Sequence, residues 1–344
     1  MSVSRRDPHK ARLRRDRIRQ ARHNERLSAP PPPDVQPSPA LPPRFAAERG
    51  MREIQALLEG QEFASDDDHN AKLAELMRGG RLHEKANAWK RDDPKWRAQE
   101  LAYDALEASD PVEALRLVHE ALKLDPDCTE AQHLMVSLAP MDLDSRIRLM
   151  RETVDKAERN MGESFIRENT GHFWRTLSTR PYMRAKRELA ELLSAAGRLT
   201  DAIAVFEQML ELNPDDNLGT RFPLLGLYLA TDQPERVNSL IARFPDEERI
   251  LGSVAWARVL ERWLSGGPDN AEAEAALEKA RKVNPFAERY VSGARPMPEE
   301  SPQYYRPGEE SDAQMCALEL APAWELHPEF REWLRGRTLG PHSG

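Results

Sequence analysis

The chain of 344 residues has few cysteines, few aromatic residues and no long apolar run. Its two cysteines, Cys128 and Cys316, are far apart in the sequence. They suggest neither a disulfide framework nor a metal-binding quartet, so a reducing cytoplasm is the expected location. No stretch approaches the roughly 18 consecutive apolar residues of a membrane span. We therefore expect no membrane insertion, and no apolar segment follows the basic start to form a secretory signal.

The sequence also lacks the motifs of common enzymes. It has no glycine-rich phosphate loop, no HExxH motif and no nucleophile elbow, and its nine histidines are scattered. His119 and His133 lie near Cys128, but no second cysteine accompanies them, so zinc is not expected. The acidic run at 66–69 is interpreted as a linker rather than a metal loop, because no second ligand cluster supports it. We expect no catalysis, no cofactor and no bound metal.

Charge is distributed unevenly along the chain. Residues 1–28 contain ten Lys or Arg residues and three acidic residues, a net charge of +7, so the rest of a chain of net charge −8 carries −15. Residues 1–44 form a basic, proline-rich tail with too little apolar material to offset the entropy of ordering, and we predict disorder there. Only the 1–28 tail offers nucleic acid an electrostatic contact. A nucleic-acid- or ribosome-associated protein tethered by this tail is the alternative function.

From Asp93 onward the pattern is helical. Apolar residues recur three and four positions apart in helix-length segments, and short Asp, Pro or Gly turns separate these segments. Hardly any segment alternates with period two, so the sequence predicts an all-α fold. Residues 45–92 are a helical lead-in, with short helices at about 45–58 and 71–77.

Three predicted helix pairs end alike, at EALKLDPD (120–127), QMLELNPDD (208–216) and KARKVNPF (279–286). Aligning their prolines brings into register the positions where the antiparallel helices of a tetratricopeptide unit pack. Small side chains there let two helices approach, a large apolar residue one turn away fills the neighbouring groove, and proline ends the second helix. These positions are Ala102, Ala114, Ala121, Ala190, Ala202, Phe206, Ala273, Leu277 and Ala280. The sequence therefore predicts a tetratricopeptide-like α-solenoid of antiparallel helix pairs over residues 93–286.

The repeats are not evenly spaced. Pro126 and Pro214 are 88 positions apart, about 20 more than two units of roughly 34 residues. We assign the extra residues to an irregular segment at 159–179. Further helices are predicted at 130–139, 144–159, 223–230 and 234–244. Residues 287–344 are predicted to form a C-terminal cap.

Short motifs in the second half of the chain go beyond the repeat pattern. They are GHFW (171–174), TRPYMRA (179–185), LNPDDNLGTR (212–221), NP at 284–285 with Tyr290, and the run 302–334 with Gly308, Glu309, Ala313, Trp324, Phe330, Trp333 and Leu334. On these residues, about 160–335 resembles bacterial tetratricopeptide proteins related to the suppressor-of-tumorigenicity-7 family. The resemblance implies a scaffold fold without enzymatic activity. Leu218 and RPGEES (306–311) depart from the family pattern.

The densest group of candidate binding residues lies in and just after the irregular segment. It comprises His172, Phe173, Trp174, Arg180, Tyr182 and Arg184. Aromatic and arginine side chains are enriched in the energetically dominant parts of protein interfaces, so this group indicates a surface for a protein partner. In the alternative interpretation, the aromatic residues fill the join made by the inserted loop, and Arg180 fixes that loop through charged hydrogen bonds.

A second set of candidates follows from repeat geometry, because the first helix of each pair lines a concave face. The inward positions are Trp96, Gln99 and Tyr103, then Arg184, Arg187 and Glu191, then Arg221, and finally Arg258 and Arg262. Guanidinium groups bind carboxylates through paired hydrogen bonds, so we expect a protein or peptide partner with an acidic segment. In the alternative, these arginines pair with the chain's own acids. The leading function is a protein–protein interaction scaffold.

Overall fold

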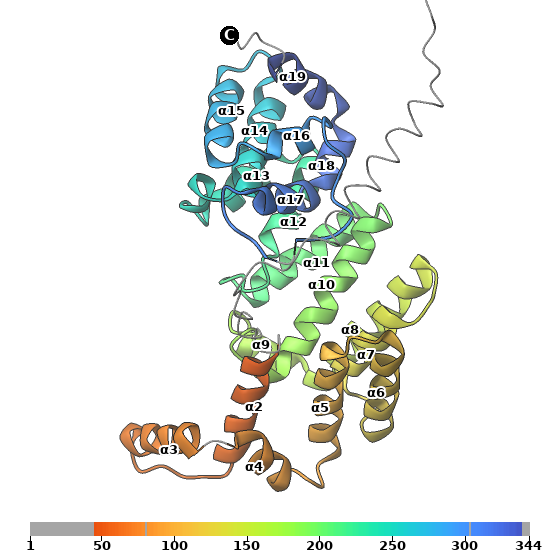
Figure 1. Cartoon of the computed structure of the whole chain (residues 1–344), viewed down its shortest axis with the longest axis vertical. Helices are drawn as coiled ribbons and strands as arrows, with labels where there is room; N and C mark the ends of the chain where they lie inside the picture. Colours follow the sequence, from red (N-terminus) through yellow and green to blue (C-terminus); the bar gives the residue numbers. More distant parts are fainter. Residues whose placement is uncertain (1–44, 80, 303, 339–344) are drawn as a thin grey trace, which may run out of the picture. The chain divides into compact units, whose positions relative to one another are not determined.

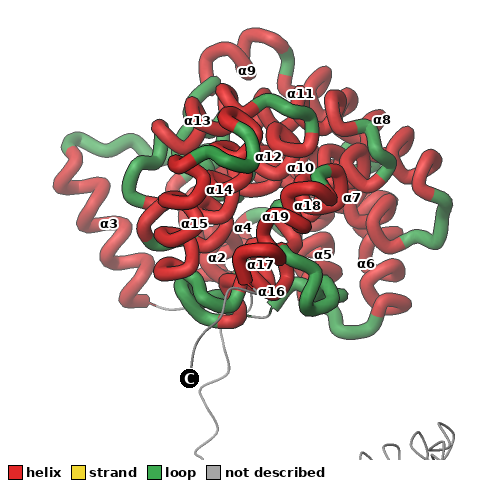
Figure 2. Tube along the Cα trace, turned by 90° about the horizontal axis from the view of Figure 1, so that it is seen from above, coloured by secondary structure: helices red, strands yellow, loops and turns green. Residues whose placement is uncertain are grey.

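The computed structural model describes residues 45–79, 81–302 and 304–338. Within these ranges the chain forms helices joined by loops and no strand, so the predicted all-α class is confirmed (Figure 1 and Figure 2). The predictions of a disordered tail at 1–44 and a nucleic-acid contact at 1–28 fall outside the described residues.

From α5 onward, most helices contact the next helix along the chain (Figure 1). The lead-in contains α2 (Ala46–Leu58), α3 (Asp66–Gly79) and α4 (Leu82–Trp89). The central part contains α5 (Pro94–Glu107), α6 (Pro111–Leu124), α7 (Thr129–Leu138), α8 (Leu143–Met161), α9 (Glu163–Asn169), η1 (Leu177–Thr179), α10 (Arg180–Ala195), α11 (Leu199–Leu212), α12 (Arg221–Ala230), α13 (Pro234–Ala242), η2 (Glu247–Arg249), α14 (Gly252–Gly266) and α15 (Ala271–Val283). The C-terminal part contains α16 (Ala287–Val291), α17 (Glu310–Glu319), α18 (Ala321–Leu326) and α19 (Pro328–Thr338).

Proline and its neighbours set many helix boundaries. At the start of α5, the Asp93 side chain accepts hydrogen bonds from the backbone N–H groups of Lys95 (2.9 Å) and Trp96 (3.1 Å), and Pro94 occupies the first helical position. Helices α6, α11 and α15 each end directly before an Asp-Pro or Asn-Pro pair. They end there because the residue before proline disfavours helical dihedrals. These helix ends agree with the sequence prediction.

The acidic run at 66–69 is helical, and its interpretation as a linker is wrong. The run forms the first turn of α3, so this helix begins before the predicted start at about residue 71. The Ser65 hydroxyl accepts a hydrogen bond from the backbone N–H of Asp68 at 3.2 Å. Three aspartates in the first turn also complement the positive end of the helix dipole. The charge that suggested a solvated linker therefore stabilises a helix start.

The helices enclose one large and two small clusters of buried side chains. The large cluster extends from α7 to α19, and a smaller one joins α5, α6 and α7. All nine residues that the sequence places at close helix contacts, from Ala102 to Ala280, are buried. Helix α5 packs on α6, α10 on α11, and α14 on α15. Seven of the nine are alanines, and burial of these small residues lets the neighbouring helices pack closely.

The C-terminal helices pack directly on the central ones. Helix α17 contacts α14, and α18 contacts α12. Gly226 of α12 makes this approach feasible, because a Cβ atom at that position would lie 2.5 Å from the carbonyl oxygen of Glu319. Asp312 of α17 is fully buried and accepts a hydrogen bond from the backbone N–H of Gly252, the first residue of α14, at 3.1 Å. The segment predicted as a cap is thus joined to the large core.

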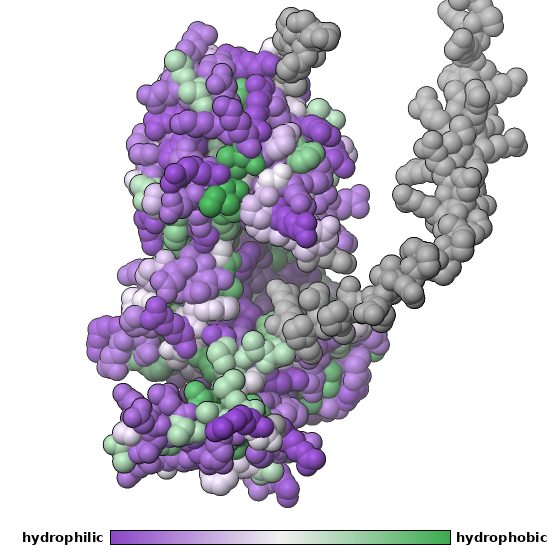
Figure 3. Space-filling view, turned by 60° about the vertical axis from the view of Figure 1, so that its left-hand side comes forward, coloured by the Kyte–Doolittle hydropathy of each residue, from purple (hydrophilic) through white to green (hydrophobic). Residues whose placement is uncertain are grey.

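The surface is mainly polar. Hydrophilic side chains predominate on the face drawn in Figure 3. Large apolar side chains that are exposed belong to different elements, such as Met77 of α3, Trp89 of α4 and Val112 of α6. Scattered apolar residues of this kind are normal on protein surfaces. Across the described ranges, no helix has both the length and the apolar character required to traverse a lipid bilayer.

Candidate binding face for a partner segment

Helix α2 lies against α5 and α10, and the contact consists mainly of charged and aromatic side chains. The ring of Phe45 stacks on that of Tyr103, with 6.1 Å between centroids and 27° between planes. The Tyr103 hydroxyl donates a hydrogen bond to Glu48 at 2.9 Å. Arg184 donates to both carboxylate oxygens of Glu48 at 3.0 Å, and Arg180 donates to one of them at 3.3 Å. We define the α2-binding face as Trp96, Glu100, Tyr103 and Asp104 of α5 together with Arg180 and Arg184 of α10.

Two arginines of α2 complete this contact with α5. The Arg52 guanidinium lies 3.7 Å from the centroid of the Trp96 ring and donates to the Trp96 carbonyl oxygen at 3.1 Å. Arg49 donates to Asp104 at 2.7 Å. Cation–π contacts of this kind contribute about 0.5–2 kcal/mol, depending on how far water is excluded. The α2-binding face is therefore basic where it meets Glu48 and acidic or aromatic where it meets Arg49 and Arg52.

Arg184 also connects α2 to α7. Its Nε atom lies 3.1 and 3.0 Å from the two oxygens of Glu130, which is fully buried. Burial alone would raise the pKa of Glu130, but Arg184 and His133 lower this pKa to about 2. Burial would lower the pKa of His133, but its hydrogen bonds to Glu130 and Glu188 raise this pKa to about 9. The buried Glu130 is thus charged. Arg184 forms ion pairs both with this carboxylate and with that of Glu48.

The raised pKa of His133 makes folding stability depend on pH. Below about pH 6.5, the ordinary histidine pKa, the imidazole is protonated in both the folded and the unfolded chain, and its ion pairs contribute fully. As the pH rises through about 9, the folded protein loses this proton and the contribution disappears. Changing His133 to Asn should therefore lower the free energy of unfolding by on the order of 2–3 kcal/mol near pH 6 and by clearly less near pH 10. Urea unfolding at the two pH values measures this; an equal loss at both would contradict the assignment.

The structure divides the predicted group at 172–184. Arg180 and Arg184 face α2, and Trp174 accompanies Arg180, whose guanidinium lies 4.9 Å from the Trp174 ring centroid. Tyr182 is buried and donates a hydrogen bond to a glutamate of α8 at 2.6 Å. His172 is exposed in the turn that precedes α10. These residues therefore do not share one surface.

The other predicted arginines bind acidic groups of the chain itself. The pairs include Arg187 with Glu191 (2.8 Å), Arg221 with Asp216 (2.7 Å) and Glu247 (2.6 Å), Arg258 with Glu261 (2.9 Å) and Glu248 (3.3 Å), and Arg262 with Glu272 (2.9 Å). Both Arg221 and Arg258 pair with glutamates of η2: Arg221 with Glu247, and Arg258 with Glu248. The basic row expected along the first helices is therefore a series of internal ion pairs. Trp96, Tyr103 and Arg184 differ from it because their contacts are with α2.

An open groove of about 960 Å³ runs beside α2. Its wall includes Met51 of α2, Trp96 and Tyr103 of α5, Cys128 and Pro181. Burial raises the pKa of the Cys128 thiol to about 11, so this thiol stays protonated at neutral pH and is a poor metal ligand. Three of the residues predicted to face a partner, Trp96, Gln99 and Tyr103, thus line a hollow large enough for several side chains of another segment.

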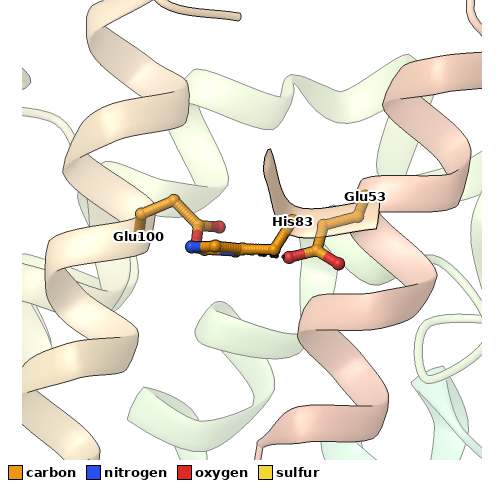
Figure 4. A group of neighbouring side chains, drawn as sticks. All are labelled: Glu53, His83 and Glu100. Carbon is orange, nitrogen blue, oxygen red and sulfur yellow. Dashed lines mark hydrogen bonds and ion pairs between the residues drawn. The ribbon is translucent and has the colours of Figure 1, made fainter. Parts of the chain in front are cut away.

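Glu53, His83 and Glu100 come together from α2, α4 and α5, with one potential metal-ligand atom of each within 4.8 Å of the others (Figure 4). The Trp96 indole donates to the Asn87 side-chain oxygen at 2.7 Å, so the Asn87 amide nitrogen faces Nε2 of His83 at 3.0 Å. Nε2 is then the acceptor, and Nδ1 carries the proton and donates it to Glu53 at 2.6 Å. A protonated Nδ1 has no lone pair for a metal. We therefore interpret the trio as a hydrogen-bonded clamp that fixes α4 to α2.

The sequence did not single out Glu48, Arg49 or Arg52. An acidic residue in the first turn of a helix has a common explanation in the helix dipole, so Glu48 carried no specific signal. Its partner Arg184 is 136 positions away, a separation that no local pattern bridges. Comparison of the chain with protein-family models finds no match, and comparison with curated proteins finds none either.

Proposed function

We propose that this chain is a tetratricopeptide-like scaffold of antiparallel helix pairs that binds a segment of a partner protein and carries out no chemistry of its own. The helix contacts support this proposal. Helix α5 packs on α6, α10 on α11 and α14 on α15, and the second helix of each pair ends before an Asp-Pro or Asn-Pro pair. Small buried residues lie at each of these contacts.

The α2-binding face supports the assignment of the binding site. One carboxylate, that of Glu48, receives hydrogen bonds from Arg184, Arg180 and Tyr103 at 2.9 to 3.3 Å. Charge-assisted hydrogen bonds from a guanidinium group are about twice as strong as neutral ones, and the planar group selects the geometry of a carboxylate. We propose that this face recognises a carboxylate on a helical segment of the partner. That contact is the observation on which the proposed function depends.

A synthetic peptide tests this proposal in the full-length chain. The probe is a labelled peptide of residues 45–61 (FAAERGMREIQALLEGQ), and the receptor is the full chain carrying Glu48→Lys, in which like charges repel the chain's own α2. Fluorescence anisotropy should show saturable binding with one peptide per chain. The matched control is the same peptide with Glu48→Lys, which should bind at least about tenfold more weakly, because Arg180 and Arg184 then repel it.

Equal affinity for the two peptides would show that the arginines do not recognise the carboxylate. Absence of binding by either peptide, with α2 displaced from the receptor, would show that the face does not bind a segment in trans. In either case the proposed function would be rejected. Helix content measured by circular dichroism should stay close to that of the unmodified chain, because α5 to α19 retain their contacts.

A further inference from the structure

We infer that α2 is a built-in occupant of the partner site, and that the partner segment is a helix with the same side-chain pattern as α2. This inference rests on the proposed function, because it requires the α2-binding face to be the partner site. It names the chemistry of the partner segment, and it makes binding of that segment depend on the release of α2.

The pattern of α2 is that of a helix bound through one face. Its contacts come from Phe45, Glu48, Arg49 and Arg52, at positions i, i+3, i+4 and i+7. This spacing places all four side chains along one side of a helix and is the usual spacing of anchors in a helix bound to a groove. The partner segment should therefore read aromatic-x-x-Glu-Arg-x-x-Arg, where x is any residue.

Charge complementarity fixes the direction of this helix. The glutamate meets Arg180 and Arg184 of α10. The next residue, Arg49, meets Asp104 of α5, and Arg52, one turn after the glutamate, meets the carbonyl and ring of Trp96 on α5. A helix in the reverse direction would bring its arginines to the α10 arginines. Repulsion between like charges would exclude that orientation.

The contact of α2 is polar, and this makes its release feasible. Within α2 the buried residues are Glu48, Glu53 and Ala56, and none of them belongs to the large core. Met51 is 42% exposed and lines the groove. Burial of apolar surface is the main favourable term in folding and in most association. For α2 it is confined to Phe45, which stacks on Tyr103, and to Ala56, which packs with Ala86 and Trp96 in a small cluster separate from the large core. Most of the contacts that hold α2 on the face are ion pairs and hydrogen bonds. A second helix with the same side chains can form each of these contacts in the place of α2.

The covalent connection controls access to the face. A tethered segment has an effective concentration on the order of millimolar, so a free helix with the same contacts competes poorly against α2. A partner then binds when it makes contacts that α2 does not make, or when the contacts of α2 with the face are weakened. The described structure is in this view the closed form of the site.

The experiment compares three full-length chains with the labelled 45–61 peptide. They are the unmodified chain, Glu48→Lys, and Glu62→Lys, which makes the same charge change at an exposed residue just after α2. Hydrogen exchange of residues 46–58 reports whether α2 has left the face. We expect Glu48→Lys to lose protection in α2 and to bind the peptide at least about tenfold more tightly than the unmodified chain. Glu62→Lys should behave like the unmodified chain. A fourth chain, Glu48→Gln, which keeps the shape of the side chain, should act in the same direction as Glu48→Lys with a smaller effect.

The outcomes separate this inference from the proposed function. Equal peptide affinity for all three chains would show that the face binds a helix without control by α2, so the inference would be overturned and the proposed function would stand. Unchanged protection of α2 in both Glu48 variants would also overturn the inference, because the ion pairs would then not be what holds α2. No binding to a chain whose α2 has lost protection would reject the proposed function itself.

Discussion

Replacing Arg184 with alanine is expected to lower the free energy of unfolding by about 3–5 kcal/mol, the usual cost of removing one partner of a buried ion pair. Arg184 binds two carboxylates, that of Glu130, which is fully buried, and that of Glu48 on α2. Without the guanidinium, both negative charges stay in a largely water-free site next to each other. Urea unfolding followed by circular dichroism near pH 7 measures the loss.

Arg187 is the matched control on the same helix. It lies one turn further along α10, its side chain is 36% exposed, and it pairs with Glu191 at i+4 and donates a hydrogen bond to the carbonyl oxygen of Leu218. Pairs of this type contribute about 0.3–0.5 kcal/mol and one hydrogen bond about 0.5–1.5 kcal/mol, so Arg187→Ala should lower stability by no more than about 2 kcal/mol. Similar losses in the two variants would mean that Arg184 does not act through its buried carboxylates, and the α2-binding face would lose its main electrostatic support.

A second large effect is expected at Phe330, where alanine should lower the free energy of unfolding by about 3–5 kcal/mol. The ring is fully buried among three tryptophans. Its centroid lies 6.0 Å from that of Trp324, 5.4 Å from that of Trp333 and 5.6 Å from that of Trp263. Trp324 and Trp333 stack on it, whereas Trp263 meets it edge-on. Truncation removes these contacts and leaves a cavity between α14, α18 and α19.

Leu326 provides the control for this substitution. It lies four residues before Phe330, but its side chain is 54% exposed, so Leu326→Ala should change stability by no more than about 0.5 kcal/mol. Tryptophan fluorescence is a local readout, because the indoles beside Phe330 would become accessible to water in Phe330→Ala only. If Phe330→Ala unfolds at the same urea concentration as the unmodified chain, the C-terminal helices do not belong to the large core.

Much of the helical framework was predictable because its causes are local. Proline after Asp or Asn ends a helix wherever it occurs, so the ends of α6, α11 and α15 follow from three dipeptides. The recurrence of apolar residues three and four positions apart identified which positions are buried, Ala202 and Phe206 among them. The wrong start of α3 concerns charges that serve as first-turn residues instead of a solvated linker. The interpretation of 159–179 as irregular is also wrong in part, because the segment contains the helix α9. The tetratricopeptide-like arrangement and the family resemblance remain predictions.

The candidate site was predictable only in part. Repeat geometry pointed to Trp96, Tyr103 and Arg184, and all three contact α2. The same reasoning selected Arg221 and Arg258, which bind acids near them in the chain. Sequence spacing gives the side of a helix on which an arginine lies, but several acids can come within reach of that side. The choice among them depends on distances of a few ångströms, which only the packed structure defines.

By itself, the sequence determined the helical class of the chain, the ends of its main helices and the small residues at helix contacts, because dihedral preferences and helical periodicity act within a few neighbouring residues. Only the tertiary structure decided that α2 occupies the face made by α5 and α10, that Glu48 and Glu130 share Arg184, and that His83 forms a clamp with Glu53. These contacts join residues 30 to 136 positions apart. Their formation depends on which surfaces remain after the helices have packed, and no local property of the chain encodes that outcome.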